Sequence, residues 1–250
     1  MRWSDKVVFI TGGAIGFGRA FASAFAAEGA AIVIADIDAA AGEGAAKALV
    51  AAGHDALAVT CDVAREDTVD AAVTAAVHRF GGIDVLINNA GKHLSKYNQP
   101  FGVLPRDEVR ALFDVNVIGV INCSIACREY MRRRSGGAIV NLSSISGFMP
   151  TSPYGVSKLA VRGLTIALAT EFGGDGIRVN AVAPGLTATE NALADLPPEM
   201  VTRFKDELQL VKRTGTMADV TSTVLFLCSD DASFITGETL KVSGGYPLGF

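Results

Sequence analysis

A tyrosine and a lysine four positions apart, Tyr154 and Lys158, are the pair in this sequence best suited to proton transfer. Residues i and i+4 share one face of a helix, so the lysine ammonium would lie near the tyrosine phenol. A free phenol has a pKa of about 10 and is a poor base at neutral pH. An ammonium about 4 Å away contributes about 4 kcal/mol at an effective dielectric of about 20, enough to lower that pKa by about three before desolvation opposes the shift. An ordinary helix-surface pair is the alternative, and the position of the pair in the chain favours an acid/base role for Tyr154.

A glycine-rich turn follows the first hydrophobic run and reads Thr11-Gly12-Gly13-Ala14-Ile15-Gly16-Phe17-Gly18. Glycine has no Cβ, so the backbone can turn tightly and approach a pyrophosphate, whose charge the free N–H groups of a following helix would meet. The spacing differs from the common Gly-x-Gly-x-x-Gly pattern, and a purely structural turn also favours glycine. Its place between an expected strand and an expected helix favours dinucleotide binding.

An aspartate, Asp36, ends the second expected strand, eighteen residues beyond Gly18. A carboxylate there can accept hydrogen bonds from both hydroxyls of an adenosine ribose and would repel a 2′-phosphate. Ile15 and Ile37 occupy positions where a basic residue would bind that phosphate, and no Arg or Lys is adjacent to Asp36 in the sequence. We therefore predict NAD rather than NADP. The alternative is that Asp36 is the N-cap of the helix that follows.

Short β-branched runs alternate with longer alanine-rich segments of helical period, a pattern typical of repeated β-α-β units. Strands are expected at 7–11, 31–36, 56–61, 85–88, 138–142, 178–183 and 239–242. Helices are expected at 16–28, 39–52, 65–80, 108–134, 154–172 and 218–227, with a less regular helical stretch at 189–210. No repeat or break in composition divides the chain. The sequence predicts one α/β domain over residues 1–250, with a doubly wound, seven-stranded parallel sheet of Rossmann-like type.

The composition argues against several classes of protein. The 250-residue chain is 50% hydrophobic and 19% charged, which excludes a disordered protein. Its net charge of −4 provides no basic field for a phosphate backbone, so no nucleic-acid partner is expected. The four cysteines form no Cys-x-x-Cys pair and have no nearby histidine, so we expect neither a metal site nor a disulfide framework. Without a signal core or an uninterrupted apolar span, a cytoplasmic protein with no membrane partner is predicted.

Short motifs follow the ends of the expected strands in a distinctive order. They are Asp62-Val63, Asn88-Asn89-Ala90-Gly91, Asn116, Ser143-Ser144, Tyr154-Gly155-Val156-Ser157-Lys158, Pro184-Gly185 and Ser243-Gly244-Gly245. With the glycine turn, they resemble the short-chain dehydrogenase/reductase family over essentially the whole chain. The sequence departs from the family pattern in one respect, because only ten positions separate Ser144 from Tyr154, fewer than in many members. Ser143 therefore stays open as an alternative to Ser144.

The resemblance implies an oxidoreductase that moves a hydride between NAD(H) and a secondary alcohol or ketone, with Tyr154 as the acid/base. It also implies that Ser144 holds the substrate oxygen, that Lys158 binds the nicotinamide ribose, and that Asn116 keeps a water beside Lys158. For Asn88, bracing of the sheet and direct contact are equal alternatives. The implied cofactor-binding residues are Gly12, Ile15, Gly16, Gly18, Asp36, Ile37, Asp62, Val63, Asn89, Ala90, Gly91, Tyr154, Lys158, Pro184, Gly185, Thr187 and Thr189.

Two long connections, at about 92–106 and 185–212, are expected to line the substrate pocket, because long loops at sheet edges commonly do so. The candidate substrate residues are His93, Ser144, Phe148, Met149, Leu186 and Leu193. This mainly apolar set predicts a hydrophobic small-molecule alcohol or ketone. The apolar tail at 246–250 could pack across a subunit boundary, and the resemblance implies a homotetramer.

Two other functions are compatible with a dinucleotide-binding chain. A non-catalytic sensor that binds a protein partner would have no need of Ser144, Tyr154 and Lys158 together. A sugar-nucleotide epimerase of related fold usually adds a substrate domain, for which 250 residues leave no room. Both remain as alternatives to the oxidoreductase.

Overall fold

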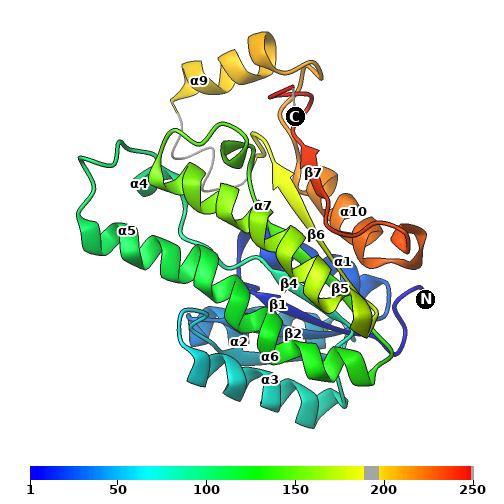
Figure 1. Ribbon diagram of the computed structural model, residues 1–250. Coiled ribbons are helices and arrows are strands. Elements are labelled where there is room, and N and C mark those ends of the chain that lie inside the picture. Colours follow the sequence, from blue (N-terminus) through cyan, green and yellow to red (C-terminus); the bar gives the residue numbers. More distant parts are fainter. Residues whose placement is uncertain (189–196, 249–250) are drawn as a thin grey trace.

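The computed structural model describes residues 1–188 and 197–248, which form one seven-stranded sheet in the order β3-β2-β1-β4-β5-β6-β7. Every neighbouring pair of strands is parallel (Figure 1). The strands are β1 (Val7–Thr11), β2 (Ala31–Asp36), β3 (Ala56–Thr60), β4 (Val85–Asn88), β5 (Gly137–Leu142), β6 (Ile177–Pro184) and β7 (Thr239–Val242). The predicted doubly wound parallel sheet is confirmed, with strand ends within one residue of the prediction.

Helices cover both faces of the sheet, because the central strands are apolar on both sides. Val8 and Ile10 of β1 face one core, and Val7 and Phe9 of the same strand face the other. The first core is closed by α1 (Gly16–Ala27), α2 (Ala39–Ala51) and α10 (Met217–Cys228). The second is closed by α3 (Glu66–Phe80), α6 (Gly119–Arg133) and α7 (Pro153–Phe172).

The strand order reverses beside β1, which has β2 on one side and β4 on the other. In an open parallel sheet, ligands bind outside the carboxyl ends of the strands at such a switch point. Thr11, Asp36, Asn88, Leu142 and Pro184 are the last residues of five strands and share this edge. The sheet therefore gathers at one edge the motifs that lie far apart in the sequence.

The predicted single helix at 108–134 is wrong in one respect. It consists of α5 (Arg106–Phe113), a π-helical turn (Asp114–Ile118) and α6. A π turn inserts one extra residue into the helix, and such turns often occur at functional sites. Here the turn contains Asn116, which is 1% exposed.

Both long connections contain a short helix, of which only the second falls within a predicted helical stretch, 189–210. The connection after β4 includes α4 (Leu94–Tyr97), and the one after β6 includes α9 (Pro198–Arg203) and a second π turn (Phe204–Leu208). In Figure 1, α9 lies beyond the carboxyl ends of the strands. Both connections therefore place ordered elements at the edge where the motifs meet.

One helical run, Arg106–Arg133, is long and apolar enough by composition to cross a membrane, with a mean hydropathy of 1.5 in its most apolar stretch. In this fold Cys123, Cys127 and Met131 of the run are fully buried against the sheet. Its most apolar stretch is 33% buried, so one face of the run packs against the sheet.

Candidate active site

A cleft of about 1270 Å³ opens at the carboxyl edge of the sheet. Most of the residues predicted from the sequence line it. They are Gly12, Ile15, Gly16, Asp36, Ile37, Asp62, Val63, Asn89, Ala90, Gly91, His93, Ser144, Tyr154, Lys158, Pro184, Gly185, Leu186 and Thr187. The structure thus brings the two ends of the predicted site, the glycine turn and the tyrosine pair, into one continuous space.

The glycine turn forms the entry to α1. Gly12 and Gly16 have φ angles of +60° and +55°, a left-handed conformation that side chains disfavour. The helix begins without a side-chain cap, since Ile15 at the N-cap offers no acceptor, so the N–H groups of the first turn remain available to an anion.

Gly18 contributes to the turn in a different way from the one predicted. It does not line the cleft, and a Cβ at this position would lie 2.1 Å from the Gly12 carbonyl oxygen. Gly18 is required for close packing of the helix beneath the turn, and its predicted contact with a cofactor stays a prediction.

The Asp36 carboxylate lies in the cleft and is held by backbone donors. It accepts hydrogen bonds from the N–H groups of Ala14 at 3.0 Å and Asp38 at 3.1 Å. Asp38 is the N-cap of α2, where its side chain accepts from the Ala41 N–H. The alternative role of Asp36 as the helix cap is therefore wrong.

Arg19, in the second turn of α1, also lines the cleft. Arg19 was not among the predicted site residues, because basic residues were expected only next to Asp36 and at position 15. Its place directly after Gly18 was the available signal. The cleft has a permanent positive charge on its α1 wall.

Two asparagines at the end of β4 have different tasks. The Asn89 amide donates to the carbonyls of Thr11 and Gly12 at 2.9 and 2.8 Å, which ties the β4 turn to the glycine turn. The Asn88 amide points into the protein and donates to Asn141 at 2.9 Å and Ser124 at 3.2 Å. Of the two alternatives for Asn88, the structure shows bracing of the sheet.

Tyr154 lies in the first turn of α7, which Ser152 caps by accepting from the Gly155 N–H. The Ser144 hydroxyl hydrogen-bonds the Tyr154 phenol, and it also accepts from the Ser146 N–H at 3.2 Å. A single 3₁₀ turn, Ile145–Gly147, allows the short connection from Ser144 to reach the tyrosine.

Ser143 is engaged elsewhere. Its hydroxyl donates to the Lys158 carbonyl at 2.9 Å, and the residue is 5% exposed. Of the two adjacent serines, the geometry therefore brings Ser144, not Ser143, to the phenol.

Lys158 is buried, and its ammonium donates to the Leu142 carbonyl at 2.7 Å. Its Nζ lies 5.8 Å from the centroid of the Tyr154 ring. Burial lowers the pKa of Lys158 to about 8. Burial also raises the pKa of Tyr154 to about 12, against the opposing effect of the hydrogen bond with Ser144.

The predicted lowering of the phenol pKa is thus wrong for the chain by itself. The cost of burying a charged phenolate exceeds the stabilisation that the hydrogen bond with Ser144 supplies. At neutral pH the Tyr154 phenol carries its proton.

Asn116 lies behind the cleft and connects its parts. Its Oδ1 accepts from the Lys92 N–H at 2.8 Å, and its Nδ2 donates to Ser157 Oγ at 3.1 Å. A Cβ at Gly91 would lie 3.3 Å from Asn116 Oδ1 and 3.6 Å from Lys158 Nζ. The glycine therefore leaves space between these two polar groups.

The substrate side of the cleft is more polar than the sequence suggested. Phe148 and Met149 lie outside the lining, and the Phe148 ring instead packs 3.6 Å from the Arg162 guanidinium carbon. Thr189 and Leu193 fall outside the described residues. Among the lining residues that were not predicted are Lys92, Ser95, Asn98, Ser146, Met200 and Phe204. Several of them directly follow Gly91 in a loop that was itself predicted to line the site.

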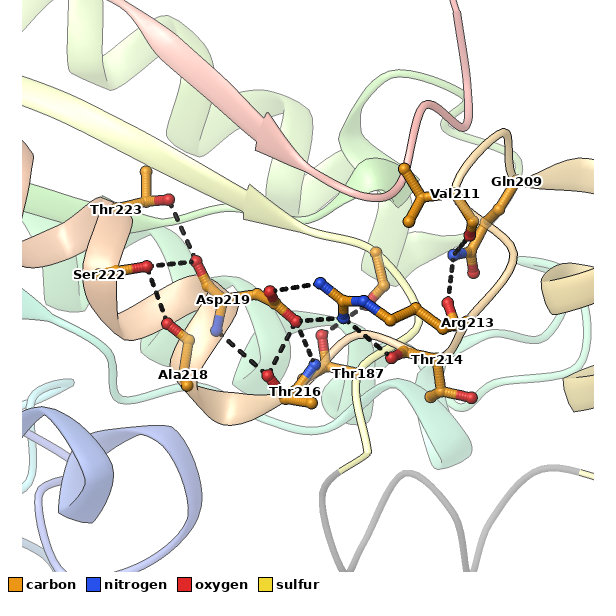
Figure 2. Close-up of polar contacts among 11 residues, drawn as sticks. Thr187, Gln209, Val211, Arg213, Thr214, Thr216, Ala218, Asp219, Ser222 and Thr223 are labelled. Carbon is orange, nitrogen blue, oxygen red and sulfur yellow. Dashed lines mark hydrogen bonds and ion pairs between the residues drawn. The ribbon is translucent and has the colours of Figure 1, made fainter.

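Thr187 is held in the lining by a network anchored on α10 (Figure 2). It pairs with Gly215 in a β-bridge, in which Gly215 N–H donates to Leu186 and Ala188 N–H donates to Gly215. Gly215 precedes Thr216, the N-cap of α10, which forms a capping box with Asp219. Arg213 binds the Asp219 carboxylate through two N–H groups at 2.6 and 2.7 Å. The network positions the segment that follows β6.

The described residues of the cleft offer little for thiol or metal chemistry. Cys61 lines the cleft, but burial raises its pKa to about 11, so it stays protonated. Within residues 1–188 and 197–248, no three His, Cys, Asp or Glu side chains are grouped so as to hold a metal ion.

Comparisons with known proteins agree on the type of protein. A family model described as enoyl-(acyl carrier protein) reductase matches residues 12–247. An uncharacterised oxidoreductase of Mycobacterium tuberculosis is 42% identical, over 97% of this chain and 98% of its own. The cis-4-hydroxycyclohexanecarboxylate dehydrogenase of Sinomonas cyclohexanicum is 38% identical, over 98% and 97%. A solved 7α-hydroxysteroid dehydrogenase, complexed with NADH and 7-oxo glycochenodeoxycholic acid, superposes with a TM-score of 0.90 at 31% identity, covering 98% and 95%.

Proposed function

The chain belongs to the short-chain dehydrogenase/reductase family and is an oxidoreductase of that type, and we propose that it transfers a hydride between NAD(H) and a ring-borne secondary alcohol or ketone. One observation carries the proposal: the hydrogen-bonded pair Ser144 and Tyr154, with Lys158 one turn on, shares a cleft with the glycine turn. Two similar proteins are named for alcohols on rings, a hydroxycyclohexanecarboxylate and a hydroxysteroid.

The residues at the glycine turn fit a dinucleotide. Positive φ angles at Gly12 and Gly16 open the backbone, and the uncapped start of α1 offers N–H groups to a pyrophosphate. The small residues Ala90 and Gly91 leave room along the floor of the cleft. When bound there, a nicotinamide would supply the hydride donor or acceptor.

The proton chemistry belongs to this chain's own residues. In reduction, Tyr154 donates its phenolic proton to the substrate oxygen while the carbonyl carbon gains the hydride. Ser144 holds that oxygen, and Ser157, which accepts from the Asn116 amide, donates to the Tyr154 backbone carbonyl and so helps to position the residue. Oxidation reverses each step, with the proton moving from the hydroxyl to Tyr154. Because the phenol is protonated at neutral pH, oxidation becomes faster as the pH rises.

The preference for NAD rests on Asp36. Its carboxylate lies in the cleft at the end of β2, where ribose hydroxyls would donate to it and a 2′-phosphate would be repelled. Arg19 on the facing helix binds the pyrophosphate in this proposal, so it does not compensate for that repulsion.

We also propose a homo-oligomer. Ile125 of α6 and Ile166 of α7 are 60% and 59% exposed in the single chain, and apolar patches of this kind commonly mark subunit contacts. Light scattering coupled to size-exclusion chromatography tests it, and a monomer at micromolar concentration would contradict it.

The experiment that tests the function follows nicotinamide absorbance with purified protein and a panel of cyclic secondary alcohols at mildly alkaline pH. NAD and NADP are compared in parallel for the wild type and for Asp36→Ser. We expect turnover with NAD, and a fall of about tenfold or more in the preference for NAD over NADP in the variant.

Other outcomes identify the alternatives. Cofactor binding without turnover on any alcohol or ketone would favour a sensor, and consumption of a nucleotide sugar would favour an epimerase. A wild type that prefers NADP would contradict the role of Asp36 and redirect attention to Arg19.

A further inference from the structure

The charges along the cleft are unevenly distributed. Two carboxylates appear in its described lining. Asp36 is the last residue of β2 and Asp62 follows β3, so both lie where the adenosine would bind in the proposed function. Three lysine or arginine side chains line it, which are Arg19, Lys92 and Lys158. Arg19 lies on the glycine-turn side and Lys158 serves the tyrosine, so the charge of Lys92 on the substrate side has no role in the proposed function.

Lys92 is fixed close to the reacting end. Its backbone N–H donates to Asn116 Oδ1 at 2.8 Å, so the π turn that contains Asn116 holds the Lys92 backbone in place. Its half-buried side chain places Nζ 5.9 Å from the centroid of the Tyr97 ring. Tyr97 is 4% exposed and belongs to a small apolar cluster against which Tyr154 packs. The Lys92 ammonium therefore lies near one ring of the apolar cluster against which the acid/base packs.

The nearby carboxylate is already engaged. Glu108 forms an ion pair with Lys96 at 2.8 Å and accepts a hydrogen bond from the Tyr97 hydroxyl at 2.8 Å. Lys92 forms no ion pair with any residue in the described part of the chain. Because Glu108 pairs with Lys96, the positive charge of Lys92 stays unneutralised by an ion pair at the cleft wall.

Asn98 adds a neutral donor to the same wall. Its Oδ1 accepts from the hydroxyl of Ser152, the N-cap of α7, at 2.9 Å. No other side chain among the described residues accepts from its amide nitrogen, and the residue lines the cleft. Because Asn98 Oδ1 accepts this hydrogen bond, the Asn98 amide nitrogen remains as a donor.

Apolar side chains complete this half of the cleft, contributed by Leu186 and by Met200 and Phe204 from α9 and the turn after it. An ammonium and an amide N–H form a donor set that suits a carboxylate, whereas the apolar side chains suit a hydrocarbon frame. The described lining on the substrate side contains no acidic group that would repel an anion.

We propose that Lys92 and Asn98 form a carboxylate subsite, so that the substrate is a cyclic secondary alcohol or ketone that bears a carboxylate away from the reacting carbon. This inference rests on the proposed function and names its substrate class. Lys92 supplies the charge and Asn98 a directed hydrogen bond, and together they orient the ring against Tyr154.

The test compares 4-hydroxycyclohexanecarboxylate with its carboxamide, which has nearly the same shape and no charge, using the full chain and NAD. We expect the acid to exceed the amide in kcat/KM by about tenfold or more, mainly through a lower KM. The ratio falls toward unity in Lys92→Met and is retained in Lys92→Arg. Lys47→Met is the control, because this exposed lysine of α2 pairs with Glu43 outside the lining, and it keeps the ratio.

Failure of this inference differs visibly from failure of the proposed function. If the wild type oxidises acid and amide equally well, the subsite is overturned and the oxidoreductase stands. If neither is oxidised, calorimetric titration of the NADH-loaded protein with cyclohexanecarboxylate and cyclohexanecarboxamide decides the matter. Tighter binding of the acid, lost in Lys92→Met, supports the subsite, and equal binding overturns it.

Discussion

The two ends of the cleft are built on different principles. At the glycine turn, the groups that face the cleft are backbone N–H donors and a carboxylate, Asp36, that is itself held by backbone N–H groups. At the tyrosine, the chemistry depends on two individual side chains. Burial raises the pKa of Tyr154 and lowers the pKa of Lys158. The first end therefore depends on the path of the chain, and the second on individual atoms that the fold can only hold in place.

The largest effect is expected at the second end, from removal of one oxygen. Tyr154→Phe removes the proton donor, so we expect kcat to fall by about 10²- to 10⁴-fold, because general acid–base catalysis contributes about that much. Steady-state kinetics measures the change, with cofactor binding followed by fluorescence. Tyr130→Phe, a partly buried tyrosine of α6 outside the cleft, is the matched control. A Tyr154→Phe enzyme with nearly the full kcat would contradict the dependence of the tyrosine end on individual atoms.

A smaller effect should appear as stability that depends on pH. Burial lowers the pKa of Lys158 from 10.5 to about 8, so the folded state holds this proton less tightly than the unfolded state. Below pH 8, burial of the charged Lys158 ammonium lowers the free energy of unfolding by its full amount. This loss is relieved as the pH rises from about 8 to about 10.5. Lys158→Met should therefore be more stable than the wild type at neutral pH by about 2 to 3 kcal/mol, at about 1.4 kcal/mol per pKa unit less the lost hydrogen bond.

Urea unfolding at pH about 7 and about 9.5 measures this gain, which should shrink at the higher pH. Lys47→Met, an exposed lysine of α2 paired with Glu43, is the control and should show no such trend. A gain that does not change with pH would mean that the charge of Lys158 is not the cause.

The smallest expected effect tests the end built from backbone. In Gly18→Ala, the new Cβ would meet the Gly12 carbonyl oxygen at 2.1 Å, so the turn must shift. Overpacking of this kind costs about 1 to 3 kcal/mol, and we expect weaker NAD binding with it. Gly44→Ala in α2, where a Cβ meets nothing within 4 Å, should instead stabilise the protein by about 0.5 to 1 kcal/mol. Thermal unfolding and NAD titration measure both, and equal behaviour of the two variants would contradict the packing role of Gly18.

Much of the fold could be predicted because its signals are local. The strand ends are within one residue of the prediction, since β-branched runs and the glycines and carboxylates that follow them mark strand ends directly. The interruption at Asp114–Ile118 could not be predicted, because a π turn has nearly the composition of an α-helix and is decided by what its residues contact.

The candidate site was predictable to the extent that it depends on spacing. Tyr154, Lys158, Asp36 and the glycine turn all line one cleft, as their places at strand ends and on one helix face imply. Phe148 and Met149 were placed wrongly, because nearness in the sequence does not say which way a side chain points, and Arg162 draws the Phe148 ring away.

By itself, the sequence determined the order of the elements, the positions that require glycine and the helix face that carries Tyr154 and Lys158. These follow from backbone sterics and helical period, which act over a few residues. Only the tertiary structure decided that Ser144 rather than Ser143 meets the phenol, that burial sets the pKa values of the pair, and that Lys92 lies near the Tyr97 ring. Each of these depends on burial and on contacts between segments that are distant in the chain, and these arise only when the sheet brings its strand ends together.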